Sequence, residues 1–208
     1  MNQLTFSKSQ KILIQSILKT KILNSAYTDS EFKTLYFYSG ISVIEGISVI
    51  EGKEGIEGKE GIEANMSYHL LLQMIYSLSL QQQNLEKLGY SFYTFTKKDI
   101  VIIDDIYFFC INPELIMPIN KNKLLVFYKP PVSSQFSSIE LKKNISIPFK
   151  ITYKTIYYSI GVLAIYCLYK KEYVNDLTSL DSIKYTKLYW FLLRCMNEKE
   201  ERRQLLII

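Results

Sequence analysis

The feature of this sequence that most constrains its fold is an uninterrupted apolar segment, YYSIGVLAIYCLY, at Tyr157–Tyr169. The pattern predicts a helix over Thr155–Leu168 whose apolar side chains point in every direction, so other parts of the chain have to surround it. The segment has 13 residues, whereas a helix needs roughly 20 to cross a bilayer. We therefore expect a buried helix at the centre of a soluble domain.

The remaining elements are predicted from the spacing of apolar residues and from turn residues. We expect further helices at Ser9–Leu23, Met66–Leu88 and Tyr185–Met196, one hairpin at 26–28 with 34–38, and another at 100–103 with 107–111. Asn65 is the candidate N-cap of the helix at Met66–Leu88, and Gly89 ends it. This order of elements is typical of an α+β fold in which helices dominate toward the C-terminus.

Residues 41–64 have the sequence ISVIEG-ISVIEG-KEGIEG-KEGIEA, a six-residue repeat with two interpretations. Hexapeptide repeats can wind into a parallel β-helix, but four short copies rich in glycine and glutamate supply little stacked core. The interpretation that we favour is a duplicated, flexible loop. The glutamates would repel phosphate, so the spaced glycines do not predict a nucleotide-binding loop.

Composition and spacing argue against several classes of site. Cys110, Cys167 and Cys195 are far apart in apolar runs, which indicates buried thiols in a reducing compartment. His69 is the only histidine, so we expect no zinc site made of histidine and cysteine. The net charge of +5 looks evenly spread, and the sequence contains no nucleic-acid recognition motif. We expect an intracellular, cytoplasmic protein that binds neither nucleic acid nor membranes.

The segment Leu85–Asp104, LEKLGYSFYTFTKKDIVIID, has framework residues at a distinctive spacing. Its leucine, glycine, isoleucine and aspartate positions match the pattern L-H-x-x-G-I-x-H-R-D-[LI]-K-P-x-N-I-x-[LI]-x-D without gaps, and this pattern resembles the catalytic loop of protein kinases. The His-Arg-Asp triplet, the lysine and the metal-binding asparagine of that loop are replaced, in this order, by Phe92, Tyr93, Thr94, Thr96 and Asp99.

Three later motifs resemble protein kinases in the same order along the chain. FSSIEL at Phe136–Leu141 resembles the end of an activation segment and retains its glutamate, Glu140. YSIGV at Tyr158–Val162 resembles the central buried helix, and the closing segment resembles a pattern whose arginine is Arg203 here. Because kinases pair these two positions, the resemblance implies a structural ion pair between Glu140 and Arg203.

The chain as a whole resembles a divergent, catalytically degenerate member of the protein-kinase-like superfamily, a pseudokinase. Its composition, rich in Ile, Lys, Asn and Tyr, is most similar to kinase-like proteins of large DNA viruses. The resemblance implies one α+β domain over residues 1–208, with a truncated N-terminal lobe at 1–40, the repeat loop at 41–64 and a helix-rich C-terminal lobe at 65–208. A viral protein of this kind would reside in the host cytoplasm.

The resemblance does not extend to the residues that carry phosphoryl transfer. Thr94 stands at the position of the catalytic base, and a threonine hydroxyl does not accept a proton at neutral pH. Asn112 stands at the position of the magnesium-binding aspartate, so Asp99 and Asn112 are residual metal candidates that make a poor site. No glycine-rich loop or nucleotide-binding lysine precedes the repeat. We therefore expect no catalytic residues, no metal and no cofactor.

Three functions remain open. The first is a catalytically inactive kinase-like protein that acts as a binding or scaffold module for a protein partner; its partner and oligomeric state stay unknown. The second is an atypical protein kinase that binds ATP and Mg²⁺ through a nonstandard group such as Asp99, Asp104 and Asp105. The third is a truncated, decaying kinase paralogue without a function of its own.

The first function carries two further expectations. Replacing Asp99 by alanine is expected to change neither folding nor activity. Four aromatic residues are candidates either for an exposed partner-binding surface or for the core that remains: Tyr36, Tyr38, Tyr90 and Tyr93.

Overall fold

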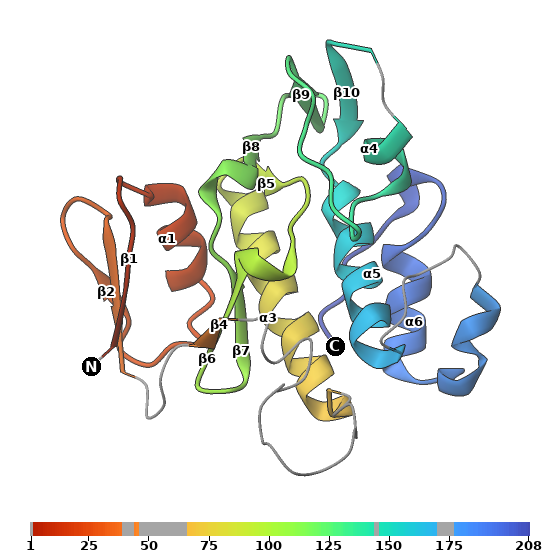
Figure 1. Ribbon diagram of the computed structural model, residues 1–208, viewed down its shortest axis with the longest axis horizontal. Coiled ribbons are helices and arrows are strands. Elements are labelled where there is room, and N and C mark those ends of the chain that lie inside the picture. Colours follow the sequence, from red (N-terminus) through yellow and green to blue (C-terminus); the bar gives the residue numbers. More distant parts are fainter. Residues whose placement is uncertain (1, 39–43, 46–65, 144–145, 170–176) are drawn as a thin grey trace, which may run out of the picture.

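The computed structural model describes residues 2–38, 44–45, 66–143, 146–169 and 177–208 (Figure 1). The elements are β1 (Asn2–Thr5), α1 (Lys11–Leu18), β2 (Tyr27–Thr28), β3 (Thr34–Phe37), β4 (Ile44–Glu45), α3 (Tyr68–Lys87), β5 (Tyr90–Phe92), β6 (Ile100–Ile103), β7 (Tyr107–Cys110), β8 (Ile116–Pro118), β9 (Leu124–Phe127), α4 (Ile139–Lys143), β10 (Phe149–Thr152), α5 (Thr155–Tyr169) and α6 (Lys187–Cys195). This mixture of helices and short strands is an α+β fold. Among the helices of these ranges, none has the length and apolar character needed to span a membrane.

Helix α5 lies in the interior, as its apolar sequence predicts. Its buried residues extend around the whole helix. Gly161 lets α6 approach closely, because a Cβ at this position would lie 2.5 Å from Met196 Cγ and 2.8 Å from Cys195 Sγ. Only a residue without a side chain fits at this contact between α5 and the end of α6.

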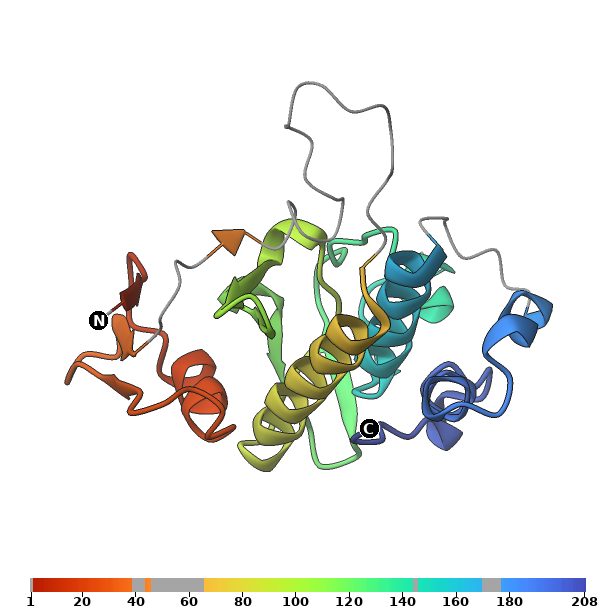
Figure 2. The ribbon, with the colours of Figure 1, turned by 90° about the horizontal axis from the view of Figure 1, so that it is seen from below.

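Helix α3 crosses the middle of the molecule, between α1 and α5 (Figure 2). It begins after Ser67, whose hydroxyl accepts a hydrogen bond from the Leu70 N–H at 3.2 Å. The predicted N-cap, Asn65, was therefore wrong, and it lies outside the described residues. The helix ends before Gly89, as predicted, and Gly89 has a φ of +83° that a residue without Cβ adopts at little cost.

Two buried amide side chains connect α3 to strands of the sheets. Gln81 Nε2 donates to the Cys110 carbonyl of β7 at 2.8 Å, while Gln81 Oε1 accepts from the Cys110 N–H at 3.0 Å. Gln82 Nε2 donates to Ser91 Oγ at 2.8 Å, and Gln82 Oε1 accepts from the Phe92 N–H at 3.3 Å, both in β5. These bonds satisfy backbone groups that burial would otherwise leave without a partner.

The predicted hairpin after residue 100 is confirmed. Strands β6 and β7 pair antiparallel, from Ile100 opposite Cys110 to Ile103 opposite Tyr107. Asp104 and Asp105 in the turn have φ values of +56° and +58°, a conformation that aspartate tolerates. Strand β4, from the first copy of the repeat, adds to β6 on the other side. The rest of the repeat lies outside the described residues, so its two interpretations stay predictions.

The N-terminal part is a three-stranded sheet packed on α1. The predicted hairpin is confirmed, because β2 pairs antiparallel with β3. Strand β1, which the sequence did not predict, covers the other edge of β3. Helix α1 is shorter than the predicted Ser9–Leu23, and Lys21 beyond its end has a φ of +57°. Asn84 Nδ2 of α3 donates to the Ser16 carbonyl of α1 at 3.3 Å, which attaches this part to the central helix.

Two more antiparallel pairs, which the sequence patterns missed, connect the second half of the chain. Strand β5 pairs with β8, and β9 pairs with β10. The β9–β10 ribbon buries one face into the core, through the side chains Leu125, Phe127, Phe149 and Ile151. Figure 1 shows this ribbon and α4 together at one end of the molecule.

Replacing Gln81 by methionine is expected to lower the free energy of unfolding by about 1–3 kcal/mol, because two buried backbone groups of Cys110 lose their partner. Gln83→Met is the matched control, since Gln83 is half-buried on the same helix and has no such contact. Urea denaturation of both variants measures the difference. Equal stability of the two variants would show that the Gln81 bonds contribute nothing.

Candidate functional site

The loop after β5 carries the positions that the kinase resemblance singles out, and the first two are buried. Phe92 is 3% exposed and Tyr93 is 6% exposed. The Tyr93 ring meets Phe127 edge-on at 5.2 Å between ring centres, and Phe127 stacks on Phe149 at 4.8 Å. Burial raises the pKa of the Tyr93 hydroxyl, while a backbone hydrogen bond at Val132 acts in the opposite direction. These two positions therefore form part of the core.

Thr94, at the position of the catalytic base, is enclosed by hydroxyls from the same chain. Its Oγ1 lies 2.7 Å from Ser137 Oγ and 3.2 Å from Ser134 Oγ. Ser134 Oγ also donates to the Phe95 carbonyl at 2.7 Å. Thr94 and Ser137 are both 1% exposed. The segment 128–138 thus lies against the loop and uses the hydrogen-bonding capacity of Thr94.

Asp99 and Asn112, the two residual metal candidates, are in direct contact. Asn112 Nδ2 donates to Asp99 Oδ1 at 2.7 Å, and Asn112 Oδ1 accepts from the Glu114 N–H at 3.0 Å. The other carboxylate oxygen of Asp99 accepts from the Thr96 N–H at 2.6 Å and from Thr96 Oγ1 at 2.8 Å. Thr96, at the lysine position, therefore serves to hold Asp99. Both carboxylate oxygens of Asp99 are therefore engaged by protein hydrogen bonds.

The three aspartates of the alternative metal site do not converge. Asp99 precedes β6, whereas Asp104 and Asp105 follow it. A strand of this length separates its ends by roughly 13 Å, so the three side chains cannot ligate one ion together. In the described part of the chain, no group of three or more His, Cys, Asp or Glu side chains is arranged to hold a metal.

A cavity of about 290 Å³ lies between the start of α1 and the strands that flank the loop. It is lined by Ser9–Leu13, Tyr90, Pro113 and Ile116. Neither Asp99 nor Asn112 contributes to its lining, and no residue of Phe92–Asp99 does. The hollow in this region is therefore separate from the positions that would bind a metal and accept a proton in a kinase.

The four tyrosines considered for a partner surface divide between surface and core. Tyr38 is 57% exposed, Tyr36 and Tyr90 are half-buried, and Tyr93 is buried. Tyr36 is stacked on Tyr27, whose ring centre lies 5.0 Å away. These residues do not form one exposed surface, because Tyr93 lies in the core and Tyr90 lines the cavity at α1.

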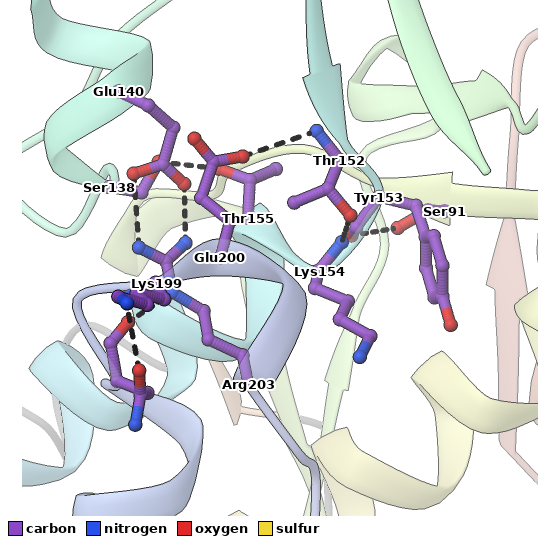
Figure 3. A network of polar contacts seen from close by, with 11 residues as sticks. Ser91, Ser138, Glu140, Thr152, Tyr153, Lys154, Thr155, Lys199, Glu200 and Arg203 are labelled. Carbon is purple, nitrogen blue, oxygen red and sulfur yellow. Dashed lines mark hydrogen bonds and ion pairs between the residues drawn. The ribbon is translucent and has the colours of Figure 1, made fainter. Parts of the chain in front are cut away.

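Glu140 and Arg203 form a two-point ion pair that joins α4 to the C-terminal segment (Figure 3). Arg203 Nη1 donates to Glu140 Oε1, and Arg203 Nη2 donates to Oε2 at 3.1 Å. Arg203 is 1% exposed. Its Nε donates to the Asn197 carbonyl at 2.9 Å, and its guanidinium lies 4.9 Å from the ring centre of Tyr158 in α5. In the interior, the guanidinium of Arg203 is therefore neutralised by the Glu140 carboxylate and also contacts the Tyr158 ring.

The pKa values of two neighbouring carboxyl groups, Glu140 and Glu200, are shifted in opposite directions. Burial raises the pKa of Glu140, but the hydrogen bond and the charge of Arg203 outweigh it, so the pKa lies below its ordinary value. Burial and the charge of Glu140 raise the pKa of Glu200. Glu200 Oε2 accepts from the Thr152 N–H of β10 at 3.4 Å (Figure 3). The C-terminal segment is thereby held against both α4 and β10.

The serine contacts around Thr94 are the part of the site that the sequence analysis missed. In the sequence, the serine pairs at 133–134 and 137–138 are typical only of a polar loop. Ser138 is also buried, and its Oγ lies 2.5 Å from Thr155 Oγ1 at the start of α5. The available signal was a serine-rich loop directly before the FSSIEL motif, but serine spacing does not tell which hydroxyls a loop buries.

Asp99→Asn is expected to lower the free energy of unfolding by about 1–3 kcal/mol, because an amide cannot accept all the hydrogen bonds made by the carboxylate. This replaces the expectation that Asp99 can be removed without an effect on folding. Asp105→Asn, in the exposed turn, is the control and should be neutral. Thermal unfolding followed by circular dichroism compares them, and an unchanged melting temperature for Asp99→Asn would contradict the structural role.

Arg203→Met is expected to cost about 3–5 kcal/mol of unfolding free energy, because Glu140 is left without its partner. Arg202→Met is the matched control, since Arg202 is exposed. The double variant Glu140→Leu with Arg203→Met should recover part of the loss, because it removes both charges. Wild-type stability of Arg203→Met in denaturant would show that the pair does not hold the domain together.

No model of a known protein family matches this sequence, and no curated protein matches it. Among solved structures, the chain is similar to a rhoptry kinase from Toxoplasma gondii, with a TM-score of 0.51 and 16% sequence identity. The match covers 66% of this chain and 42% of that chain, so it spans less than half the length of the kinase. At this identity the likeness concerns the fold alone. The chain has a protein-kinase-like α+β fold.

Proposed function

We propose that this chain is a catalytically inactive kinase-like protein, a pseudokinase, that serves as a binding or scaffold module in the cytoplasm. The observation that carries the proposal is the environment of Thr94. A protein kinase needs a carboxylate there to accept the proton of a substrate hydroxyl. Here a buried threonine is hydrogen-bonded to Ser134 and Ser137 of its own chain. A substrate hydroxyl finds no base at this position, and the Thr94 hydroxyl is already hydrogen-bonded within the chain.

The contacts of Asp99 and Asn112 support the same proposal. Mg²⁺ is usually bound by one or two carboxylates together with substrate phosphates, and it keeps several waters. The single carboxylate of Asp99 is engaged by Thr96 and Asn112. A neutral amide next to it adds no negative charge. We therefore propose that the chain has no ATP or magnesium cofactor.

The replaced positions still contribute to folding, which favours a working protein over a decaying remnant. Phe92 and Tyr93 pack in the core, and Thr96 supports Asp99. The Glu140–Arg203 pair keeps its two-point geometry. Selection for a folded surface accounts for these contacts. The resemblance to kinase-like proteins of large DNA viruses would make the partner a protein of the host or of the virus.

Nucleotide binding and phosphoryl transfer test the proposal. We expect millimolar ATP with Mg²⁺ or Mn²⁺ to leave the melting temperature unchanged, and labelled ATP to give no phosphate transfer to the chain or to a generic substrate. Asp99→Asn is measured beside the wild type, with each protein's own nucleotide-free melting curve as its reference.

A saturable rise in the wild-type melting temperature that Asp99→Asn abolishes would overturn the proposal in favour of an atypical kinase. Measured phosphate transfer would do the same. A wild-type chain that unfolds without cooperativity and is cleaved throughout by protease would instead favour the decaying paralogue.

A further inference from the structure

The positive charge of this protein is concentrated in one segment of the chain. Residues 119–154 contain seven lysines and a single acidic residue, Glu140, which gives this segment a net charge of +6, whereas the whole chain has +5. The rest of the chain is therefore close to neutral. The carboxylate of Glu140 is ion-paired with Arg203, which lies outside this segment.

The fold gathers this segment at one end of the molecule. It contains β9, β10 and α4, which Figure 1 shows together at the top of the view. The β9–β10 ribbon turns its apolar face into the core, so the alternating side chains face outward. Lys150 is on that outward face of β10 and is exposed. We call the group Lys129, Lys142, Lys143 and Lys150, all of them exposed, the lysine cluster.

Large apolar side chains are exposed among these lysines. Tyr128 is 76% exposed, Val132 is 60% exposed and Ile147 is 46% exposed. Tyr128 and Ile147 lie just beyond the last pair of the ribbon, in which Phe127 is opposite Phe149. The same end of the fold therefore offers both positive charge and apolar surface that the chain itself does not cover.

Two acidic side chains lie beside β10, near Lys150 of the cluster. Glu200 and Glu201 line a cavity of about 430 Å³ together with Lys123, Lys150 and Lys154. Lys199 and Arg202 flank these glutamates in the sequence. No ion pair is found for the lysine cluster among the described residues, although Lys142 Nζ donates to the Gln135 carbonyl at 3.0 Å.

The chemistry of this end discriminates between anionic partners. Protein interfaces are depleted in lysine and enriched in arginine, and residues 119–154 contain no arginine. Nucleic acid would pair with the lysines, but its phosphates offer nothing to exposed aliphatic groups such as Val132 and Ile147. A bilayer with anionic headgroups matches both features, because lysines reach the headgroups while tyrosine and aliphatic side chains enter the interface.

We propose that this end of the fold is a peripheral docking surface for an anionic lipid bilayer. The lysine cluster supplies the electrostatic attraction, and Tyr128, Val132 and Ile147 enter the headgroup region. This goes beyond the proposed scaffold function, because it locates the protein at a membrane surface in addition to its protein partner. It also replaces the expectation, based on evenly spread charge, that the chain has no membrane partner.

Co-flotation of the full chain with vesicles tests the proposal. We expect binding to phosphatidylcholine vesicles that contain phosphatidylserine, loss of binding in high salt because the charges are screened, and little binding to phosphatidylcholine alone. The variant K129Q/K142Q/K143Q/K150Q should bind on the order of 100-fold more weakly. The control K8Q/K19Q/K184Q/K187Q removes the same charge from exposed lysines elsewhere and should change binding less than about threefold.

The apolar contribution has its own pair of variants. Y128S/V132S/I147S should lower binding at least about tenfold, whereas Y38S/Y185S, at exposed tyrosines outside the surface, should not. Melting curves verify that each variant is folded. The salt dependence of vesicle binding by the wild type tests the electrostatic contribution without any substitution.

Three results would overturn the proposal. The first is no binding to the anionic vesicles. The second is equal loss of vesicle binding in the two lysine variants, or no loss in Y128S/V132S/I147S, either of which means nonspecific attraction by net charge. The third is binding to single-stranded poly(U) or to duplex DNA at salt concentrations where vesicles are not bound, which would identify a nucleic-acid surface. None of these measurements depends on nucleotide, so their failure is distinct from a failure of the pseudokinase proposal.

Discussion

Buried amide side chains on helix α3 hold three other elements in place. A helix in the middle of a small fold normally offers only apolar side chains to its neighbours. Apolar contacts alone do not fix where a neighbouring strand lies along the helix. Gln81 and Gln82 instead bind the backbones of β7 and β5, and Asn84 binds that of α1. Each bond is worth little by itself, but a buried amide without its partner is costly. The helix therefore fixes where the strands lie along its length, and with them the loop between β5 and β6.

In the loop held in this way, the three positions that align with the His-Arg-Asp triplet carry side chains that pack or hydrogen-bond inside the chain. Phe92 and Tyr93 extend the core toward the β9–β10 ribbon through the rings of Phe127 and Phe149. Thr94 turns to the serines of segment 128–138. Phe92, Tyr93 and Thr94 carry no charge and have their contacts inside the chain, whereas Asp99 has a carboxylate that Thr96 and Asn112 engage.

The sequence predicted what depends on local pattern and missed what depends on distant pairing. The all-round apolar pattern of Thr155–Tyr169 leads directly to a buried helix, and Asp104 between two apolar runs leads to the β6–β7 turn. Strands β1, β9 and β10 are four-residue segments whose partners lie more than 20 residues away, so no local pattern identifies them. The burial of Thr94 follows from the path of segment 128–138, which propensities do not encode. The concentration of lysine after residue 119 was readable from the sequence, but counting charge over the whole chain concealed it.

If the chain is a pseudokinase, as proposed, the packing of Tyr93 limits how the kinase residues could return. A return to the kinase pattern would require arginine at this position, which is 6% exposed and meets the edge of Phe127. An unpaired guanidinium there would cost several kcal/mol of stability, on the scale of other buried charges that lack a partner. A single reversion would therefore damage the fold before it could restore any chemistry. On the pseudokinase proposal, the core that stabilises the loop would therefore also block a stepwise return to the kinase residues.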